Sequence, residues 1–167
     1  ESSDFRNQLV LDLSNPEVQD YVFGIVDKLM TSYPGIAYFK WDCNSPITNV
    51  YSAYLKDKQS HLYIEHVRGL YKVLKRVKDK YPTLPMMLCS GGGARCDYEA
   101  LKYFTEFWAS DNTDGVERIF IQWGFSHFFP SKSIAAHVTS WGKEPLKLPL
   151  DVAMVCKLVF DIQLHEM

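Results

Sequence analysis

The chain has 167 residues, of which 47% are hydrophobic and 14% aromatic, and this composition excludes a disordered or fibrous chain. Its formal net charge of −2 excludes the broad basic surface that nucleic acid or an anionic membrane would need, so we expect a small, uncharged partner. No apolar run reaches the ~18 residues of a membrane span, and the first residues have no signal-peptide character. The chain is therefore either cytosolic or lacks its leader, and its localisation stays open.

Neither the cysteines nor the histidines have the spacing of a metal site. The four cysteines lack the C-x-x-C pairs of zinc sites, and no histidine forms a cluster with another histidine or a carboxylate. We therefore expect free thiols, no metal and no cofactor.

The first half of the chain is predicted to form a strand, a helix and a second strand. A short apolar strand over 8–13 precedes a helix that Asn15 caps and Pro16 begins. Apolar residues recur at helical spacing until Tyr33-Pro34-Gly35 ends this helix, and a buried strand follows over 36–42. After a polar loop, a long amphipathic helix presents lysines and arginines to solvent. Its buried side consists of Leu55, Leu62, Val67, Leu70, Tyr71, Leu74 and Val77.

The second half continues the alternation of strands and helices. Strands are predicted over 84–89 and 105–110, separated by glycines at 91–93 and a helix over 97–104. No low-complexity linker or domain boundary interrupts the pattern.

In the last third of the chain, the sequence allows more than one assignment of helices and strands. A cap at Asp114, with an acid three residues later, begins a helix that runs to Trp123. A fifth strand is predicted over 125–129, and 135–139 continues or repeats it. The apolar run 152–163 fits either a helix or a strand.

Single helices between strands predict parallel βαβ units and therefore an α/β fold. Three consecutive strands end in chemically versatile residues: Lys40 and Asp42, then Cys89 with its glycines, then Trp108 and Asp111. An open sheet concentrates its site at one switch point, whereas a TIM barrel collects residues from successive strands around one axis. We therefore predict a partial TIM (β/α)8 barrel, since a complete one needs roughly 250 residues.

The end of the strand over 36–42 supplies a candidate nucleophile. Residues two apart in a strand share a face, so Lys40 and Asp42 point the same way and Trp41 points the other way. A cation beside a carboxylate keeps that carboxylate ionised, and an ionised, positioned aspartate can act as a nucleophile. The alternative is an ion pair that only closes the strand end.

Three motifs follow one another along the chain: Lys40-Trp41-Asp42-Cys43-Asn44, Cys89-Ser90-Gly91-Gly92-Gly93-Ala94-Arg95 and Trp108-Ala109-Ser110-Asp111-Asn112-Thr113-Asp114. With these motifs in this order, the chain resembles the family 36 α-galactosidases, which are melibiases of glycoside hydrolase clan D. The resemblance covers nearly the whole chain. It implies retaining hydrolysis of terminal α-D-galactosyl residues on a TIM barrel.

The resemblance also implies roles for individual residues. Asp42 matches the family nucleophile, and Asp111 matches the acid/base. The positions that line the galactose subsite are matched by Lys40, Cys89, Gly91, Gly92 and Trp108. Residues 1–167 would form a single segment of the catalytic barrel, from before the fourth strand onward, and we expect the full-length protein to be a homo-oligomer. Because the family's earlier strands carry further sugar-binding residues, we expect the isolated segment to be inactive.

Two-carboxylate chemistry agrees with the positions of the motifs. Asp42 and Asp111 lie two βα units apart and would converge, and a retaining pair stands ~5 to 5.5 Å apart. Lys40 favours an ionised Asp42, so we expect Asp111 to hold the proton. The alternative for Asp111 is a helix N-cap, a role that Thr113 and Asp114 can also fill.

Other functions stay open on the sequence alone. Gly91 to Gly93 could form a dinucleotide- or phosphate-binding loop, although Cys96 stands where that motif has glycine or alanine. A noncatalytic sugar-binding module would account for the tryptophans but makes no use of two carboxylates. Cys89 could also be a nucleophile, with His127 or His137 as its base.

Overall fold

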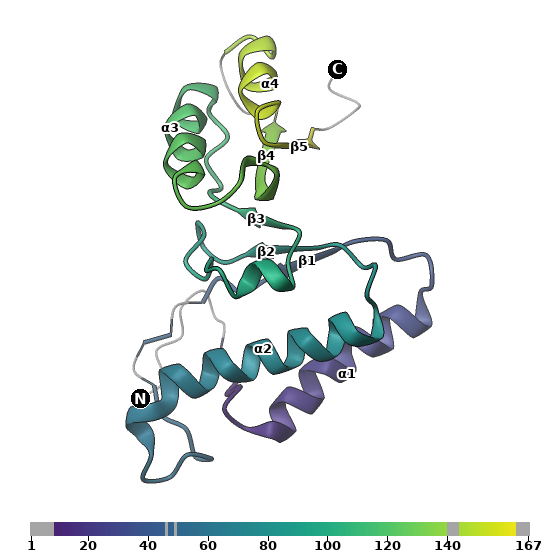
Figure 1. Cartoon of the computed structure of the whole chain (residues 1–167), viewed down its shortest axis with the longest axis vertical. Helices are drawn as coiled ribbons and strands as arrows, with labels where there is room; N and C mark the ends of the chain where they lie inside the picture. The colour runs from purple at the N-terminus through teal and green to yellow at the C-terminus, as the bar shows by residue number, and fades with distance from the viewer. Residues whose placement is uncertain (1–8, 46, 49, 140–143, 163–167) are drawn as a thin grey trace. The chain divides into compact units, whose positions relative to one another are not determined.

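The computed structural model describes residues 9–162, apart from positions 46, 49 and 140–143 (Figure 1). The chain divides into two compact units. The first contains Glu1–Phe39 and Ser45–Pro85, and the second contains Lys40–Asn44 and Met86–Met167.

Two long helices, α1 (Pro16–Ser32) and α2 (Leu62–Lys80), pack against each other in the first unit (Figure 1). The start of α1 is as predicted, because the Asn15 side chain accepts the Glu17 N–H at 3.0 Å and a proline stands in the first turn. The buried apolar residues of α2 are Leu62, Leu70, Val73, Leu74 and Val77. The predicted buried side of this helix is therefore confirmed for Leu62, Leu70, Leu74 and Val77, whereas Val67, predicted to be buried, is 41% exposed.

The strand predicted over 8–13 is wrong for the residues that the structure describes, from 9 onward. Its last residues turn instead into α1, because the Asp12 carboxylate accepts the Ser14 N–H at 3.0 Å. A side chain that satisfies nearby backbone groups in this way competes with strand pairing. Gln8 lies outside the described residues.

The second helix starts later than predicted. Leu55 precedes it in a turn, and a short 3-10 helix, η1 (Gln59–His61), leads into Leu62. Lys56 adopts a φ of 51°, a left-handed conformation that an α-helix cannot include.

Five strands form one sheet, nearly all of it in the second unit. They are β1 (Phe39–Asp42), β2 (Met86–Cys89), β3 (Glu106–Trp108), β4 (Ile134–Thr139) and β5 (Lys157–Asp161). Their spatial order follows the chain, and β2 to β5 pair in parallel. A doubly wound dinucleotide-binding sheet instead reverses its strand order at a switch point. The α/β prediction is therefore confirmed, and the dinucleotide-binding alternative is wrong.

The helices of the second unit are α3 (Gly115–Ser126) and α4 (Lys147–Ala153), which contact each other and β4 (Figure 1). The strand predicted over 125–129 is wrong, because α3 continues to Ser126 and the Phe128 N–H bonds to the Phe125 carbonyl at 3.0 Å. The run over 152–163 contains both predicted kinds of element, the end of α4 and then β5.

The helix predicted over 97–104 is reduced to one 3-10 turn, η2 (Ala100–Lys102). The Asp97 carboxylate accepts the Ala100 N–H at 2.8 Å, and the chain enters β3 only four residues after the turn ends. The glycine loop after β2 is therefore not followed by an α-helix.

Candidate active site

The residues singled out from the sequence gather at the carboxyl ends of β1, β2 and β3. Cys89, the last residue of β2, stands opposite Trp108, the last residue of β3. The Cys43 N–H, directly after β1, donates to the Cys89 carbonyl at 2.9 Å. These pairings place the end of β1, with Asp42, beside Cys89. The predicted convergence of successive strand ends is therefore present in the second unit.

Trp108 joins several of these groups. Its indole N–H donates to the Asp111 carboxylate at 2.6 Å, and the Lys40 ammonium lies 4.2 Å from the centroid of its ring. The His137 ring stacks on the indole with centroids 3.6 Å apart. An N–H to carboxyl oxygen distance of 2.6 Å is a short hydrogen bond, and a cation over an indole is attracted to its π-face. Trp108 therefore contacts both the Asp111 carboxyl group and the Lys40 ammonium.

Lys40 and Asp42 share a face of β1, as predicted. Both are exposed in this chain, and they alternate with the less exposed Phe39 and Trp41. The contact that the structure shows for the Lys40 ammonium is with Trp108. The sequence pattern therefore identified the face correctly but not the aromatic neighbour of the lysine.

Cys89 is only 3% exposed. Burial raises the pKa of the Cys89 thiol to about 11, with the charge of Lys40 opposing and those of Asp42 and Asp111 adding to the shift. A thiol with this pKa is protonated at neutral pH, and only the thiolate is a strong nucleophile, which argues against Cys89 as a nucleophile.

The glycines after β2 form a backbone turn that other residues would strain. Gly91, Gly92 and Gly93 have φ values of 57°, 81° and 82°. A Cβ atom at Gly93 would lie 2.5 Å from the Phe125 ring, whereas at Gly91 it would meet nothing closer than the Asn44 carbonyl oxygen at 3.7 Å. Gly93 therefore serves packing, and Gly91 and Gly92 present backbone where a ligand could approach.

Asn44 is a site residue to which the sequence assigned no role. Its side-chain oxygen accepts the Gly91 N–H at 2.9 Å and lies 3.9 Å from the Cys89 sulfur. Its position two residues after Asp42 in the first motif was the available signal. Asn44 fixes the glycine turn to the end of β1.

Asp111 is not a helix cap. Asp114 caps α3, accepting the Val116 and Glu117 N–H groups at 3.0 and 2.9 Å. Hydrogen bonds from the Glu117 backbone and the Glu144 side chain hold the pKa of Asp114 below its ordinary value. The predicted cap is confirmed, and the alternative that Asp111 caps the helix is wrong.

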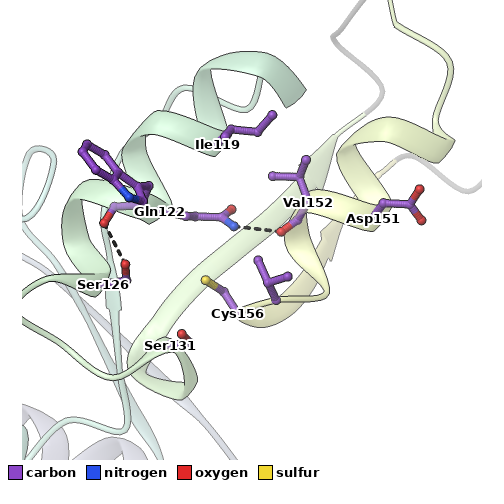
Figure 2. Close-up of a pocket in the computed structure, with 9 residues that line it drawn as sticks. Ile119, Gln122, Ser126, Ser131, Asp151, Val152 and Cys156 are labelled. Atoms are coloured by element: carbon purple, nitrogen blue, oxygen red, sulfur yellow. Dashed lines mark hydrogen bonds between the residues drawn. The ribbon is translucent and has the colours of Figure 1, made fainter.

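A separate hollow of about 440 Å³ lies between α3, α4 and the residues that follow α4 (Figure 2). Its wall consists of Ile119, Gln122, Trp123, Ser126, Ser131, Asp151, Val152, Val155 and Cys156. Figure 2 shows the Gln122 side chain directed at the Val152 carbonyl, to which it donates at 2.8 Å. None of the site residues predicted from the sequence lines this hollow.

The described residues contain neither a group of metal ligands nor a membrane-spanning helix. Between residues 9 and 162, apart from the gaps given above, no three His, Cys, Asp or Glu side chains are grouped as metal ligands would be. Within the same residues, no helix has the length and apolar character needed to cross a membrane.

Comparison with known proteins decides the family. The melibiase family model matches residues 1–167 of this chain. The chain belongs to the melibiase family. The resemblance predicted from the three motifs is therefore confirmed.

Melibiase-family relatives match nearly all of this chain but only part of their own. Alpha-galactosidase Mel36A of Lactobacillus acidophilus is 36% identical, over 97% of this chain and 23% of its own length. The crystal structure of an α-galactosidase from Lactobacillus brevis superposes with a TM-score of 0.94 at 32% identity, over 100% of this chain and 23% of that one. A raffinose complex of the GH36 α-galactosidase AgaA from Geobacillus stearothermophilus gives 0.92 at 34% identity, over 99% and 24%.

The chain thus spans about a quarter of the proteins it resembles. The parallel α/β segment is consistent with part of a barrel, as predicted. The roles of Asp42, Asp111, Lys40, Cys89, Gly91, Gly92 and Trp108 stay predictions.

Proposed function

We propose that residues 1–167 form one segment of the catalytic barrel of a retaining α-galactosidase that hydrolyses terminal α-D-galactosyl residues of small oligosaccharides. The observation that supports this proposal is that the ends of β1, β2 and β3, with Asp42, Cys89 and the Trp108–Asp111 hydrogen bond, lie side by side at the carboxyl edge of a parallel sheet. Family membership supports the reaction, and complexes of AgaA with raffinose and with stachyose support the substrate class.

In the proposed first step, the Asp42 carboxylate attacks the anomeric carbon while the bond to the leaving oxygen breaks. Asp111 gives its proton to that oxygen, and the galactosyl group becomes an ester of Asp42. Because Trp108 holds one Asp111 oxygen at 2.6 Å, the proton in transfer is carried by the other oxygen.

In the second step, the ionised Asp111 takes a proton from water, and the water oxygen attacks the anomeric carbon. The ester bond breaks, Asp42 returns as a carboxylate, and galactose leaves with its original anomeric configuration. Lys40, Cys89, Gly91, Gly92 and Trp108 form part of the galactose subsite in this proposal. Because the Cys89 thiol is protonated, it is suited to hydrogen bonding with a sugar hydroxyl rather than to nucleophilic attack on the sugar.

The nucleophile is tested with Asp42→Ala in the full-length protein. Turnover of an aryl α-galactoside should fall below detection, and added azide should restore part of it and give a galactosyl azide of inverted configuration. The matched control is Asp79→Ala, an exposed aspartate of α2 that should leave turnover unchanged. Wild-type turnover by Asp42→Ala would refute the assignment.

The acid/base is tested separately with Asp111→Ala. The value of kcat/KM should fall roughly 10²- to 10⁴-fold for a poor leaving group and far less for a dinitrophenyl one, which needs no protonation. If the wild-type protein binds galactose in calorimetry but turns over neither substrate, the noncatalytic sugar-binding module is the correct function.

A further inference from the structure

Arg118 is a buried cation that the proposed reaction does not use. It lies on α3 with only 3% of its surface exposed. Burial lowers the pKa of its guanidinium, yet an arginine pKa starts so far above neutrality that the group stays charged. Keeping a charge inside a protein is costly unless its hydrogen bonds are satisfied. We therefore expect the Arg118 guanidinium to make hydrogen bonds that a neutral side chain of the same size could not make.

The guanidinium makes three hydrogen bonds, two of them to backbone carbonyls beside the active site. Its Nη2 group donates to the Ala135 carbonyl at 2.8 Å, and Nη1 donates to the Ser110 carbonyl at 3.3 Å. Ala135 on β4 stands opposite Trp108 on β3. Ser110 directly precedes Asp111. Arg118 thus connects the backbone just before Asp111, the proposed acid/base, to β4, the strand that pairs with the one carrying Trp108.

Gln122, one turn further along α3, holds the arginine in this position. Its side-chain oxygen accepts from Arg118 Nε at 3.3 Å, and its amide donates to the Val152 carbonyl at 2.8 Å. Figure 2 shows this amide reaching across to Val152 in the wall of the hollow. Gln122 is only 4% exposed, so both of its bonds are sheltered from water.

We propose that Arg118, held by Gln122, is a positioning residue for Asp111. Trp108 fixes the carboxylate of Asp111, and Arg118 fixes the backbone from which that carboxylate projects. Without the Arg118 contact, the Asp111 carboxylate would keep its hydrogen bond to Trp108 but would no longer be held at a fixed distance from the leaving oxygen. The inference rests on the proposed function, in which Asp111 donates a proton to that oxygen.

The test uses Arg118→Met in the full-length protein, because methionine fills similar volume without donors. We expect kcat/KM for an unactivated α-galactoside, such as raffinose, to fall roughly 10- to 100-fold, the range for a misplaced catalytic group. For a dinitrophenyl α-galactoside it should change less than about threefold, since that leaving group needs no proton. Arg118→Lys should recover little, because an ammonium cannot bridge both carbonyls.

Gln122→Met provides a second variant that keeps the arginine and disturbs the fold less. It should show the same preference for the activated substrate with a smaller loss. Arg76→Met is the matched control, because Arg76 is an exposed arginine on α2 whose loss should affect neither substrate.

Equal losses on both substrates in folded Arg118→Met or Gln122→Met would overturn the inference and leave Arg118 a structural residue. If Arg118→Met does not fold, Gln122→Met alone decides in the same way. If Asp111→Ala itself shows no dependence on the leaving group, the proposed function falls, and the inference falls with it. If Asp111→Ala shows that dependence and neither variant does, only the inference falls.

Discussion

The two units of this chain handle charge in opposite ways. In the first, the charges of α1 and α2 pair at the surface, as Arg76 does with Asp20 at 2.7 Å, over a core of apolar residues. In the second, a glutamate and an arginine are almost completely buried, and a lysine lies against an indole. Exposed ion pairs contribute little to stability, whereas buried charges must be satisfied in place. The first unit therefore pairs charges at its surface around an apolar core, whereas the second unit contains charged side chains in its interior.

The buried glutamate of the second unit is Glu106 on β3. It is 0% exposed and accepts from the Lys157 ammonium on β5 at 2.5 Å. The two strands are separated by β4, where Ala135 stands opposite both Trp108 and Lys157. The small alanine lets the long lysine cross to Glu106. An ion pair thus lies on the same face of the sheet as Trp108.

The largest expected effect concerns activity of the chain by itself. Although the second unit contains both proposed catalytic aspartates, the 167-residue chain should show no measurable turnover of an aryl α-galactoside. Its five strands form an open sheet, and holding a substrate correctly can be worth ~7 to 11 kcal/mol. Assay of the purified chain, with Asp42→Ala as control, decides this. Ordinary glycosidase rates that vanish in the control would mean that the second unit holds a sufficient site.

The next effect tests whether buried charge in the second unit must be paired. Lys157→Met in the full-length protein should destabilise it by less than the ~3 to 5 kcal/mol of a fully buried pair, because Glu106 would lose this ammonium but the lysine is 40% exposed. The double variant with Glu106→Met should recover much of this loss. Chemical denaturation of both variants gives the comparison. A single variant as stable as wild type would show that Glu106 does not depend on Lys157.

A smaller effect tests whether the first unit depends on close packing. Gly69 lies on α2 where a Cβ atom would stand 1.8 Å from the Leu13 carbonyl oxygen. Gly69→Ala should therefore cost about 1 to 3 kcal/mol through overpacking. Gly24→Ala on α1 is the matched control, because no atom lies within 4 Å of its added Cβ. Thermal melting should separate the two variants, and equal melting temperatures would contradict the packing argument.

The smallest effect concerns pH and the surface of the first unit. Side-chain hydrogen bonds from Lys80 and Tyr81 lower the pKa of Asp27 below its ordinary value of 3.8. A carboxyl with a lowered folded pKa contributes stability that is fully present above pH 3.8 and is lost as pH falls through the folded value. Lys80→Met should raise the Asp27 pKa toward 3.8 and reduce this acid sensitivity, as carboxyl NMR titration would show. An unchanged titration relative to a Lys72→Met control would refute the assignment.

The sequence predicted features whose causes are local. The cap at Asn15 and the cap at Asp114 each depend on a few neighbouring residues, and both were found where expected. The prediction of a strand over 8–13 was wrong because a strand must pair with a distant segment, and local composition does not reveal whether such a partner exists. The apolar run 125–129 failed because the same residues could extend the preceding helix.

For the site, the sequence placed residues on strand ends but could not show their contacts. The stacking of His137 on Trp108 and the position of Lys40 over the same ring depend on the register between strands. Arg118 was unrecognisable as a buried cation because charged residues on amphipathic helices normally face solvent. The identities of the site residues were thus predictable, and the network that holds them was not.

The raised thiol pKa values have a consequence for resistance to oxidation. All four cysteines are free, and burial raises the pKa of Cys43, Cys89, Cys96 and Cys156. With a pKa of about 11, only about one Cys89 side chain in 10,000 is a thiolate at pH 7. The thiolate is the form that attacks peroxides and disulfide reagents, so these cysteines should oxidise slowly. We therefore expect the four cysteine thiols to stay reduced in aerated buffer without added reductant.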